Sequence, residues 1–193
     1  GCRRGSCSRT CPARAGRGGG SSDAAFTLRL LNQVFDLALT TDELKDYASQ
    51  LGSDCSFFIQ DDALLGRGRG EILSPISVTL KGKFLIVVKP DIHISTAEAY
   101  AGVRPQAPPY DLKEVVENRA VEEWKDLLRN DFEDPVFKKY PTIAGLKNTL
   151  YNEGALYASM SGSGAAVFGI FSDNRDLKNL FKEMAIWSGT LLA

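Results

Sequence analysis

A run of small residues near the start of the chain has the composition of an anion-binding site. It reads Gly18-Gly19-Gly20-Ser21-Ser22-Asp23 and leads directly into an amphipathic segment. Glycines let the backbone approach a bulky anion, and the first N–H groups of a helix point outward at the positive end of its macrodipole. These properties predict a phosphate cradle, although a glycine linker before a helix would have the same residues. The residues assigned to the cradle are Gly16, Gly18, Gly19, Gly20, Ser21 and Ser22.

The surrounding sequence narrows the kind of anion site. No lysine follows the glycines, so the run is not a Walker loop, and its spacing does not complete the dinucleotide fingerprint. An anion held mainly by backbone N–H groups is what remains. Ser22 is expected to cap the following helix, whose apolar face repeats every three to four residues from Ala24 to Phe35.

A carboxylate in the segment Leu51-Gly52-Ser53-Asp54 has the position expected of a general base. It lies between a helix end and a short apolar stretch, and a fixed, partly desolvated Asp can accept a proton from a substrate hydroxyl. Such help typically contributes about 10²–10⁴-fold to a rate. An Asx turn that opens the next element explains Asp54 equally well.

The segment Ser161-Gly162-Ser163-Gly164 is the third candidate for a binding site. It joins two expected strands, 155–160 and 165–171, and its small residues permit close approach of a ligand or of another loop. A simple hairpin is the alternative. The run is nevertheless richer in small polar residues than a hairpin requires.

Several elements must position these residues. Thr40-x-x-Glu43 predicts a capping box for a helix that ends at Gly52, and Ser95-x-x-Glu98 predicts another for a helix through about Ala101. Residues 55–59 are expected to form a short buried strand or turn. Strands are expected at 71–73 and 78–88, with a hairpin around 81–83 and an end at Pro90.

The second half of the chain is expected to begin with helices. Residues 111–152 have mostly helical periodicity after a proline-rich linker at 105–109, and Gly154 ends the last helix. After the strands on either side of the Ser-Gly-Ser-Gly run, a closing helix is expected at about 175–185. Strands mixed with helices without regular alternation predict an α+β fold.

Composition restricts the partners and the compartment. The chain has 193 residues and a formal net charge of −1, and five arginines lie within residues 1–17, which leaves an acidic body that disfavours a nucleic-acid partner. No apolar run approaches the ~20 residues that span a bilayer. The first three cysteines (Cys2, Cys7, Cys11) do not have the spacing of zinc ligands, and Cys55 is the only cysteine in the rest of the sequence. A reducing, cytoplasmic location is therefore expected.

The motifs resemble, in order, those of the GHMP kinase superfamily, and in particular its bacterial-type cytidyl-diphosphate sugar-alcohol kinases. The matching segments are GGGSSDAA, LGSDCSFF, GRGEILSPI, ISTAEAY and ASMSGSGAAVFG, which cover roughly Gly18 to Phe171. The resemblance implies phosphorylation by ATP of the 2-hydroxyl of 4-diphosphocytidyl-2-C-methyl-D-erythritol, in the non-mevalonate route to isoprenoid precursors. It also implies an S5-like half followed by a ferredoxin-like half.

The same resemblance assigns roles to residues. Asp54 matches the catalytic aspartate, and the glycine-serine run matches the ATP loop. Mg²⁺ is expected to arrive with ATP, with Ser21 or Ser22 as its candidate protein ligands. The residues matched to segments beside the substrate or the phosphates are Ser95, Thr96, Ser161, Gly162, Ser163 and Gly164.

The sequence also departs from the family pattern. Only about seventeen residues precede Gly18, and none resembles the family's first motif with its lysine and its cytosine-binding residues. An impaired, N-terminally truncated kinase is therefore expected, with an atypical segment at 1–17, the ATP-binding part at 18–90 and a C-terminal domain at 91–193. Another GHMP kinase, of homoserine or mevalonate type, and a non-catalytic nucleotide-binding fragment remain alternatives.

Overall fold

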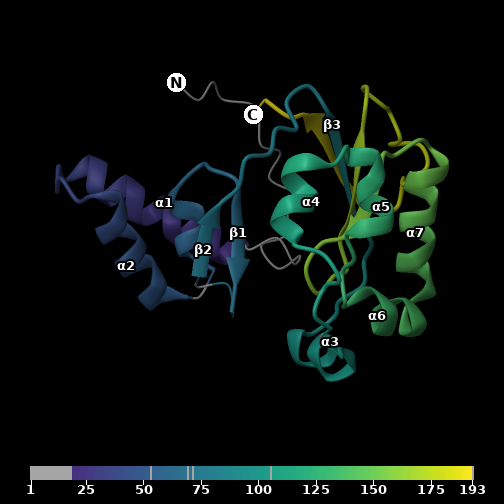
Figure 1. Ribbon diagram of the computed structural model, residues 1–193, viewed down its shortest axis with the longest axis horizontal. Coiled ribbons are helices and arrows are strands. Elements are labelled where there is room, and N and C mark those ends of the chain that lie inside the picture. Colours follow the sequence, from purple (N-terminus) through teal and green to yellow (C-terminus); the bar gives the residue numbers. More distant parts are fainter. Residues whose placement is uncertain (1–18, 53, 69, 71, 105, 193) are drawn as a thin grey trace.

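The chain is described here by a computed structural model, which defines residues 19–52, 54–68, 70, 72–104 and 106–192. Figure 1 shows two helices and a small hairpin on one side, and a larger sheet with its helices on the other. The elements on the first side are α1 (Gly19–Val34), α2 (Thr41–Leu51), the 3₁₀ helix η1 (Ser56–Ile59), β1 (Leu64–Arg67) and β2 (Ile72–Pro75).

Helices α1 and α2 and the short helix η1 share a small apolar core. Its buried members are Ala25 of α1, Leu44 and Ala48 of α2, Cys55 just before η1, and Ile59 of η1. The predicted capping box starts α2, because the Thr40 backbone N–H donates to the Glu43 carboxylate at 2.8 Å while Thr40 Oγ1 accepts from the Glu43 N–H. The backbone N–H of Gly52 closes the helix on the Ala48 carbonyl at 3.2 Å.

Helix α1 differs from its prediction in two ways. It begins at Gly19, so Ser22 lies within the first turn and is not the N-cap. The packing of Ala25 against η1 and α2 holds the helix over glycines of poor helix propensity. The expected apolar face is buried only in its first half, since Val34 and Phe35 are 64% and 66% exposed.

The expected hairpin around 81–83 is wrong, and a different hairpin forms. Gly82 does adopt a positive φ of 81°, and the Lys83 N–H bonds to the Leu80 carbonyl at 3.0 Å, so the turn is present. The preceding residues Val78 and Leu80 pack against an apolar cluster instead of pairing as a strand. Strand β1, which has no alternating pattern, pairs antiparallel with β2.

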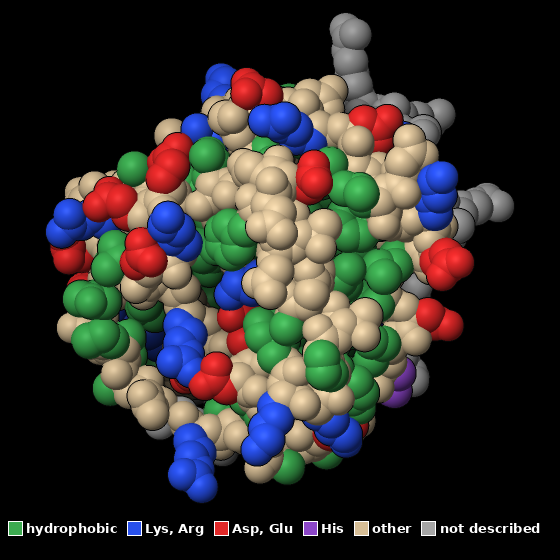
Figure 2. Space-filling model, turned by 90° about the vertical axis from the view of Figure 1, so that its right-hand side faces the viewer, with side chains coloured by type: hydrophobic (Ala, Val, Ile, Leu, Met, Phe, Trp, Pro, Cys, Tyr) green, Lys and Arg blue, Asp and Glu red, His purple; other side chains and the backbone are tan. Residues whose placement is uncertain are grey.

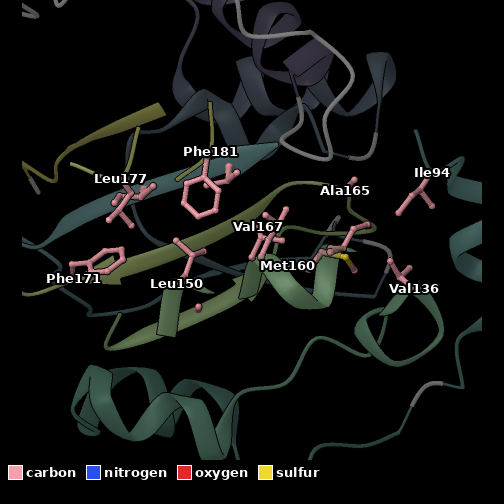
Figure 3. Close-up of a cluster of buried hydrophobic side chains, with 14 of the residues drawn as sticks. Ile94, Val136, Leu150, Met160, Ala165, Val167, Phe171, Leu177 and Phe181 are labelled. Atoms are coloured by element: carbon pink, nitrogen blue, oxygen red, sulfur yellow. The ribbon is translucent and has the colours of Figure 1, made fainter. Parts of the chain in front are cut away.

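The second half centres on an antiparallel sheet with the strand order β4-β5-β3-β6. Its strands are β3 (Phe84–Lys89), β4 (Tyr157–Met160), β5 (Val167–Phe171) and β6 (Ala185–Thr190). Because side chains alternate across a sheet, β3 directs Ile86 and Val88 into the main core and Leu85 into a second cluster. Figure 3 shows this main core, with Phe171 and Val167 of β5 beside Leu150 and Met160.

The expected helical region is confirmed, as several short helices. The helices are α3 (Thr96–Gly102), α4 (Leu112–Asn118), the 3₁₀ helix η2 (Val121–Glu123), α5 (Trp124–Leu127), α6 (Glu133–Lys139) and α7 (Pro141–Asn152). Helix α7 packs on β4 and β5. Gly154 follows α7 with a φ of 94°, as a glycine that ends a helix does.

The expected closing helix at 175–185 is also wrong. The chain there forms successive turns, in which the Leu180 N–H bonds to the Leu177 carbonyl and the Met184 N–H bonds to the Phe181 carbonyl, each at 3.0 Å. Leu177 and Phe181 still enter the core (Figure 3). Buried apolar residues four positions apart are also typical of a helix, which explains the error. Strand β6 then pairs with β3 along its full length.

Candidate active site

Asp54 lies in the turn between α2 and η1. The Cys55 N–H bonds to the Gly52 carbonyl at 3.1 Å, and burial of Cys55 in the small core fixes the backbone of this turn. The Asp54 side chain is exposed, and its Oδ1 lies 3.3 Å from the point that a Cβ on Gly70 would occupy. Gly70, with a φ of 105°, therefore lets the end of the β1–β2 hairpin approach the carboxylate.

The first turn of α1 is anchored to the same small core as Asp54. Ser21 and Ser22 are half-buried in that turn, one turn before Ala25, and Ala25 shares its cluster with Cys55. Gly16 and Gly18 lie outside the described residues. Gly19 and Gly20 begin the helix, and a Cβ on Gly20 would meet nothing within 4 Å. The structure contains the helix start at which the phosphate cradle is predicted, and the cradle itself stays a prediction.

The Ser161–Gly164 segment forms the tight connection between β4 and β5 that its small residues predict. The Ser161 N–H bonds to the Ala166 carbonyl at 2.8 Å, and the Gly164 N–H bonds to the Ser161 carbonyl at 3.0 Å. Gly162 and Gly164 have positive φ values of 54° and 91°. A Cβ on Gly164 would lie 2.8 Å from Met160 Sδ, so both the conformation and the space select glycine.

The segment that contains Ser95 and Thr96 lies beside this turn. Ile94 is buried, and its Cδ1 would be 3.1 Å from a Cβ on Gly164. Ser95 caps α3, because its Oγ accepts the Glu98 N–H at 3.1 Å, and both Ser95 and Thr96 are exposed. The structure thus places two separately predicted pieces of the site next to each other.

The expected capping box of α3 is only half formed. The Glu98 carboxylate does not return to the Ser95 backbone but accepts from Lys139 Nζ at 2.7 Å and from the Tyr140 hydroxyl at 2.8 Å. These hydrogen bonds, Lys139 first, lower the pKa of Glu98. Lys139 and Tyr140, which are 41 and 42 residues away in the sequence, thus replace the Ser95 backbone as partners of Glu98. Their hydrogen bonds connect α3 to the junction of α6 and α7.

Two residues that hold the end of β4 and the Ser161–Gly164 turn were not predicted. Asn130 Nδ2 donates to the carbonyls of Met160 and Gly162, at 2.8 and 2.9 Å. Glu133, only 5% exposed, accepts from the Met160 N–H at 2.8 Å and from Lys147 Nζ at 2.6 Å. A buried glutamate is unusual enough to attract attention, but nothing in the sequence shows that it is buried.

None of the described site residues named above lines either of two further cavities, although Arg129 and Asp131, on either side of Asn130, line the first. The first, of about 870 Å³, has Arg104, Tyr110 and Lys138 among its lining residues, and the other, of about 1020 Å³, has Asp62 and Trp124. Within the described ranges, no cluster of three His, Cys, Asp or Glu side chains could hold a metal ion. None of the described helices is long and apolar enough to cross a membrane.

Both halves of the chain match models of one kinase class. Residues 5–61 match the GHMP kinase N-terminal domain, and residues 112–187 match the GHMP kinase C-terminal domain. The fold is therefore that of a GHMP kinase, as the motifs predict. Solved structures of homoserine kinase from Cytophaga hutchinsonii and of mevalonate kinase from L. major share this fold, with TM-scores of 0.69 and 0.68 at 15% and 21% identity.

More similar proteins narrow the class. A 4-diphosphocytidyl-2-C-methyl-D-erythritol kinase of Bacteroides thetaiotaomicron is 52% identical over 83% of this chain, which spans 58% of that protein. A second kinase of the same name, from Parabacteroides distasonis, is 46% identical over 93% of this chain. This chain covers 67% of the length of that protein. A crystal structure of 4-(cytidine 5'-diphospho)-2C-methyl-D-erythritol kinase matches at 28% identity with a TM-score of 0.77, covering 96% of this chain and 69% of that one. The chain belongs to the 4-diphosphocytidyl-2-C-methyl-D-erythritol kinase family.

Proposed function

We propose that this chain provides the phosphate-binding and acceptor-binding parts of a kinase that transfers a phosphoryl group from ATP to the 2-hydroxyl of 4-diphosphocytidyl-2-C-methyl-D-erythritol. The observation that carries the proposal is the position of Asp54, on a turn held by Cys55, which is buried in the same small core as Ala25 near the start of α1. The names of relatives 46% and 52% identical support the choice of substrate.

Each piece of the site has a part in this proposal. The N–H groups at the start of α1 would hold phosphate oxygens, which suits the exposed and sterically open Gly20. Asp54 would orient or deprotonate the attacking hydroxyl, because phosphoryl transfer asks the protein mainly for positioning and charge stabilisation. The exposed Ser95 and Thr96 and the adjoining Ser161–Gly164 turn would contact the substrate or its phosphates.

Magnesium fits this site only as a companion of ATP. The described residues offer no cluster of carboxylates for a protein-bound ion, so phosphate oxygens would supply most of the ligands. The hydroxyls of Ser21 and Ser22, half-buried in the first turn of α1, are the candidate protein ligands. Bound there, the ion would neutralise charge on the transferring phosphate. We place this activity in the cytoplasm.

A single replacement tests the proposed role of Asp54. Asp54→Asn keeps the size of the side chain and removes the base, so kcat should fall by about 10²–10⁴-fold while the affinity for ATP is retained. The measurement is ADP release with the cytidyl alcohol, with homoserine and with mevalonate as separate acceptors. Asp62→Asn, an exposed replacement in the same part of the chain, is the matched control.

The outcomes separate the alternatives. Turnover with homoserine or mevalonate but not with the cytidyl alcohol would assign another GHMP kinase activity. Calorimetry that detects ATP binding in a chain without turnover would indicate a nucleotide-binding protein without catalysis. Equal kcat values for the Asp54→Asn and Asp62→Asn variants would remove Asp54 from the mechanism.

A further inference from the structure

Side chains occupy the outer edge of strand β4. This strand pairs with β5 on one side and is the first strand of the sheet. On its other side the Tyr151 hydroxyl donates to the Ala158 carbonyl at 3.1 Å, and Glu133 Oε1 accepts the Met160 N–H at 2.8 Å. The hydrogen bonds therefore continue along β4 up to the point where the Ser161–Gly164 turn begins.

Asn130 extends this row of hydrogen bonds into the turn itself. Its Nδ2 bonds both to the last carbonyl of β4, at Met160, and to the carbonyl of Gly162 within the turn. Its Oδ1 accepts the Phe132 N–H at 3.0 Å, which fixes the orientation of the amide. One planar group thus joins the end of a rigid strand to the middle of the turn, and only an amide offers both donors and the acceptor.

The support of Asn130 is itself rigid. The Glu133 N–H bonds to the Asn130 carbonyl at 2.9 Å, so the backbone of Asn130 is closed into the start of α6. Glu133 is buried and is held by Lys147 of α7 at 2.6 Å and by the Ser159 hydroxyl at 3.1 Å. Asn130 therefore projects from a framework shared by α6, α7 and β4.

We propose that Asn130 is a positioning residue that holds the Ser161–Gly164 turn in the geometry needed for phosphoryl transfer. This inference rests on the proposed function, in which the turn contacts substrate or phosphates. Gly162 and Gly164 both occupy the left-handed region, where glycine has many alternatives, so the turn needs a constraint from outside. Two hydrogen bonds from a fixed amide supply that constraint.

Asn130→Asp tests the inference with an almost isosteric change. The variant retains an oxygen for the Phe132 N–H but loses the donor to both carbonyls and places a carboxylate against them. Asn130→Ala removes the donor without adding charge, which covers the case in which the charged variant folds poorly. Asn174→Asp, in the exposed loop after β5, makes the same chemical change elsewhere.

Two readouts are measured on the full chain. Hydrogen exchange of the backbone amides of Ser161 and Gly164 should become about tenfold faster in both Asn130 variants, with β5 and α7 unchanged. kcat for the cytidyl alcohol should fall by about 10²-fold with little change in KM for ATP, because misplacement of a positioning group by about 1 Å has effects of that size. Asn174→Asp should match the wild type in both.

The two readouts can also overturn the inference. Unchanged exchange in the turn, or faster exchange spread evenly over the whole sheet, would show that Asn130 does not hold the turn specifically. Faster exchange with an unchanged kcat would show that the position of the turn does not matter for transfer. A wild-type chain that phosphorylates none of the acceptors and binds neither ATP nor the cytidyl alcohol would refute the proposed function, and the exchange pattern alone would then decide whether Asn130 holds the turn.

Discussion

At the scale of single residues, two glycines differ in whether their position requires glycine. Gly164 has a φ of 91° and no room for a side chain, because a Cβ would lie 2.8 Å from Met160 Sδ and 3.1 Å from Ile94 Cδ1. Gly145 lies in the middle of α7, where a Cβ would meet nothing within 4 Å. The turn therefore requires its glycine, and the helix does not.

These glycines give a paired prediction on stability. Gly145→Ala should raise the free energy of unfolding by about 0.5–1 kcal/mol, because alanine has the better helix propensity. Gly164→Ala should lower it by about 1–3 kcal/mol through backbone strain and overpacking. Urea denaturation of both variants beside the wild type measures the two effects. Stabilisation by Gly164→Ala would show that the turn can relax around a methyl group.

At the scale of elements, one buried ion pair connects two helices to a strand. Lys147 of α7 contacts Glu133 of α6 at 2.6 Å, and Glu133 in turn binds the backbone of β4 at Met160. The side chains of Lys147 and Glu133 are 22% and 7% exposed. Because the carboxylate is buried, its charge depends on Lys147 for compensation.

Lys147→Met is therefore expected to destabilise the protein by about 3 kcal/mol, since it leaves an uncompensated buried charge while it keeps the apolar stem. The double variant Glu133→Gln, Lys147→Met should regain most of that loss, because glutamine still offers an oxygen to Met160. Thermal unfolding of both variants provides the measurement. The exposed pair Arg119–Glu123 is the control, and Arg119→Met should cost less than about 1 kcal/mol.

The elements that sequence reasoning predicted correctly are those set by neighbouring residues. The Thr40 capping box and the Gly154 helix end each depend on interactions within a few residues. The errors arise where distant contacts decide. Glu98 bonds to Lys139 and Tyr140 instead of its local partner, and Val78 packs in a cluster instead of a strand.

The same contrast applies to the candidate site. The small residues of the Ser161–Gly164 turn and the carboxylate of Asp54 stand out in the sequence because their types suit the chemistry. Asn130 lies 30 and 32 positions from the carbonyls that it binds, so its role depends on how α6 meets β4. No local pattern carries that information.

At the scale of the whole molecule, apolar clusters cover both faces of the central sheet. Tyr157 of β4 belongs to the cluster that contains Trp124. It is 8% exposed and packs edge to face with Trp124 and Phe168, at 5.8 and 5.9 Å between ring centroids. Burial raises its pKa to about 12. Figure 2 shows the face of the molecule that lies on the right in Figure 1. Acidic and basic side chains are interspersed on this face, so no electrostatic field of a single sign covers it.

This buried tyrosine predicts a loss of stability in alkali. Its stabilising effect is complete below about pH 10, where the unfolded tyrosine is also neutral, and is lost as the pH rises through about 12. Between pH 9 and pH 12 the unfolding free energy of the wild type should fall by about 2 kcal/mol more than that of Tyr157→Phe. Tyr47→Phe, at a half-exposed tyrosine, should behave as the wild type does.

The side chains along the outer edge of β4 have a consequence for how this protein meets other polypeptides. Three of the groups that an incoming strand would need, the Ala158 carbonyl and the N–H and carbonyl of Met160, already have partners in Tyr151, Glu133 and Asn130. Strand addition there would have to expel a buried carboxylate, a barrier that natural proteins use against intermolecular sheets. These contacts therefore also oppose the addition of a further strand at this edge.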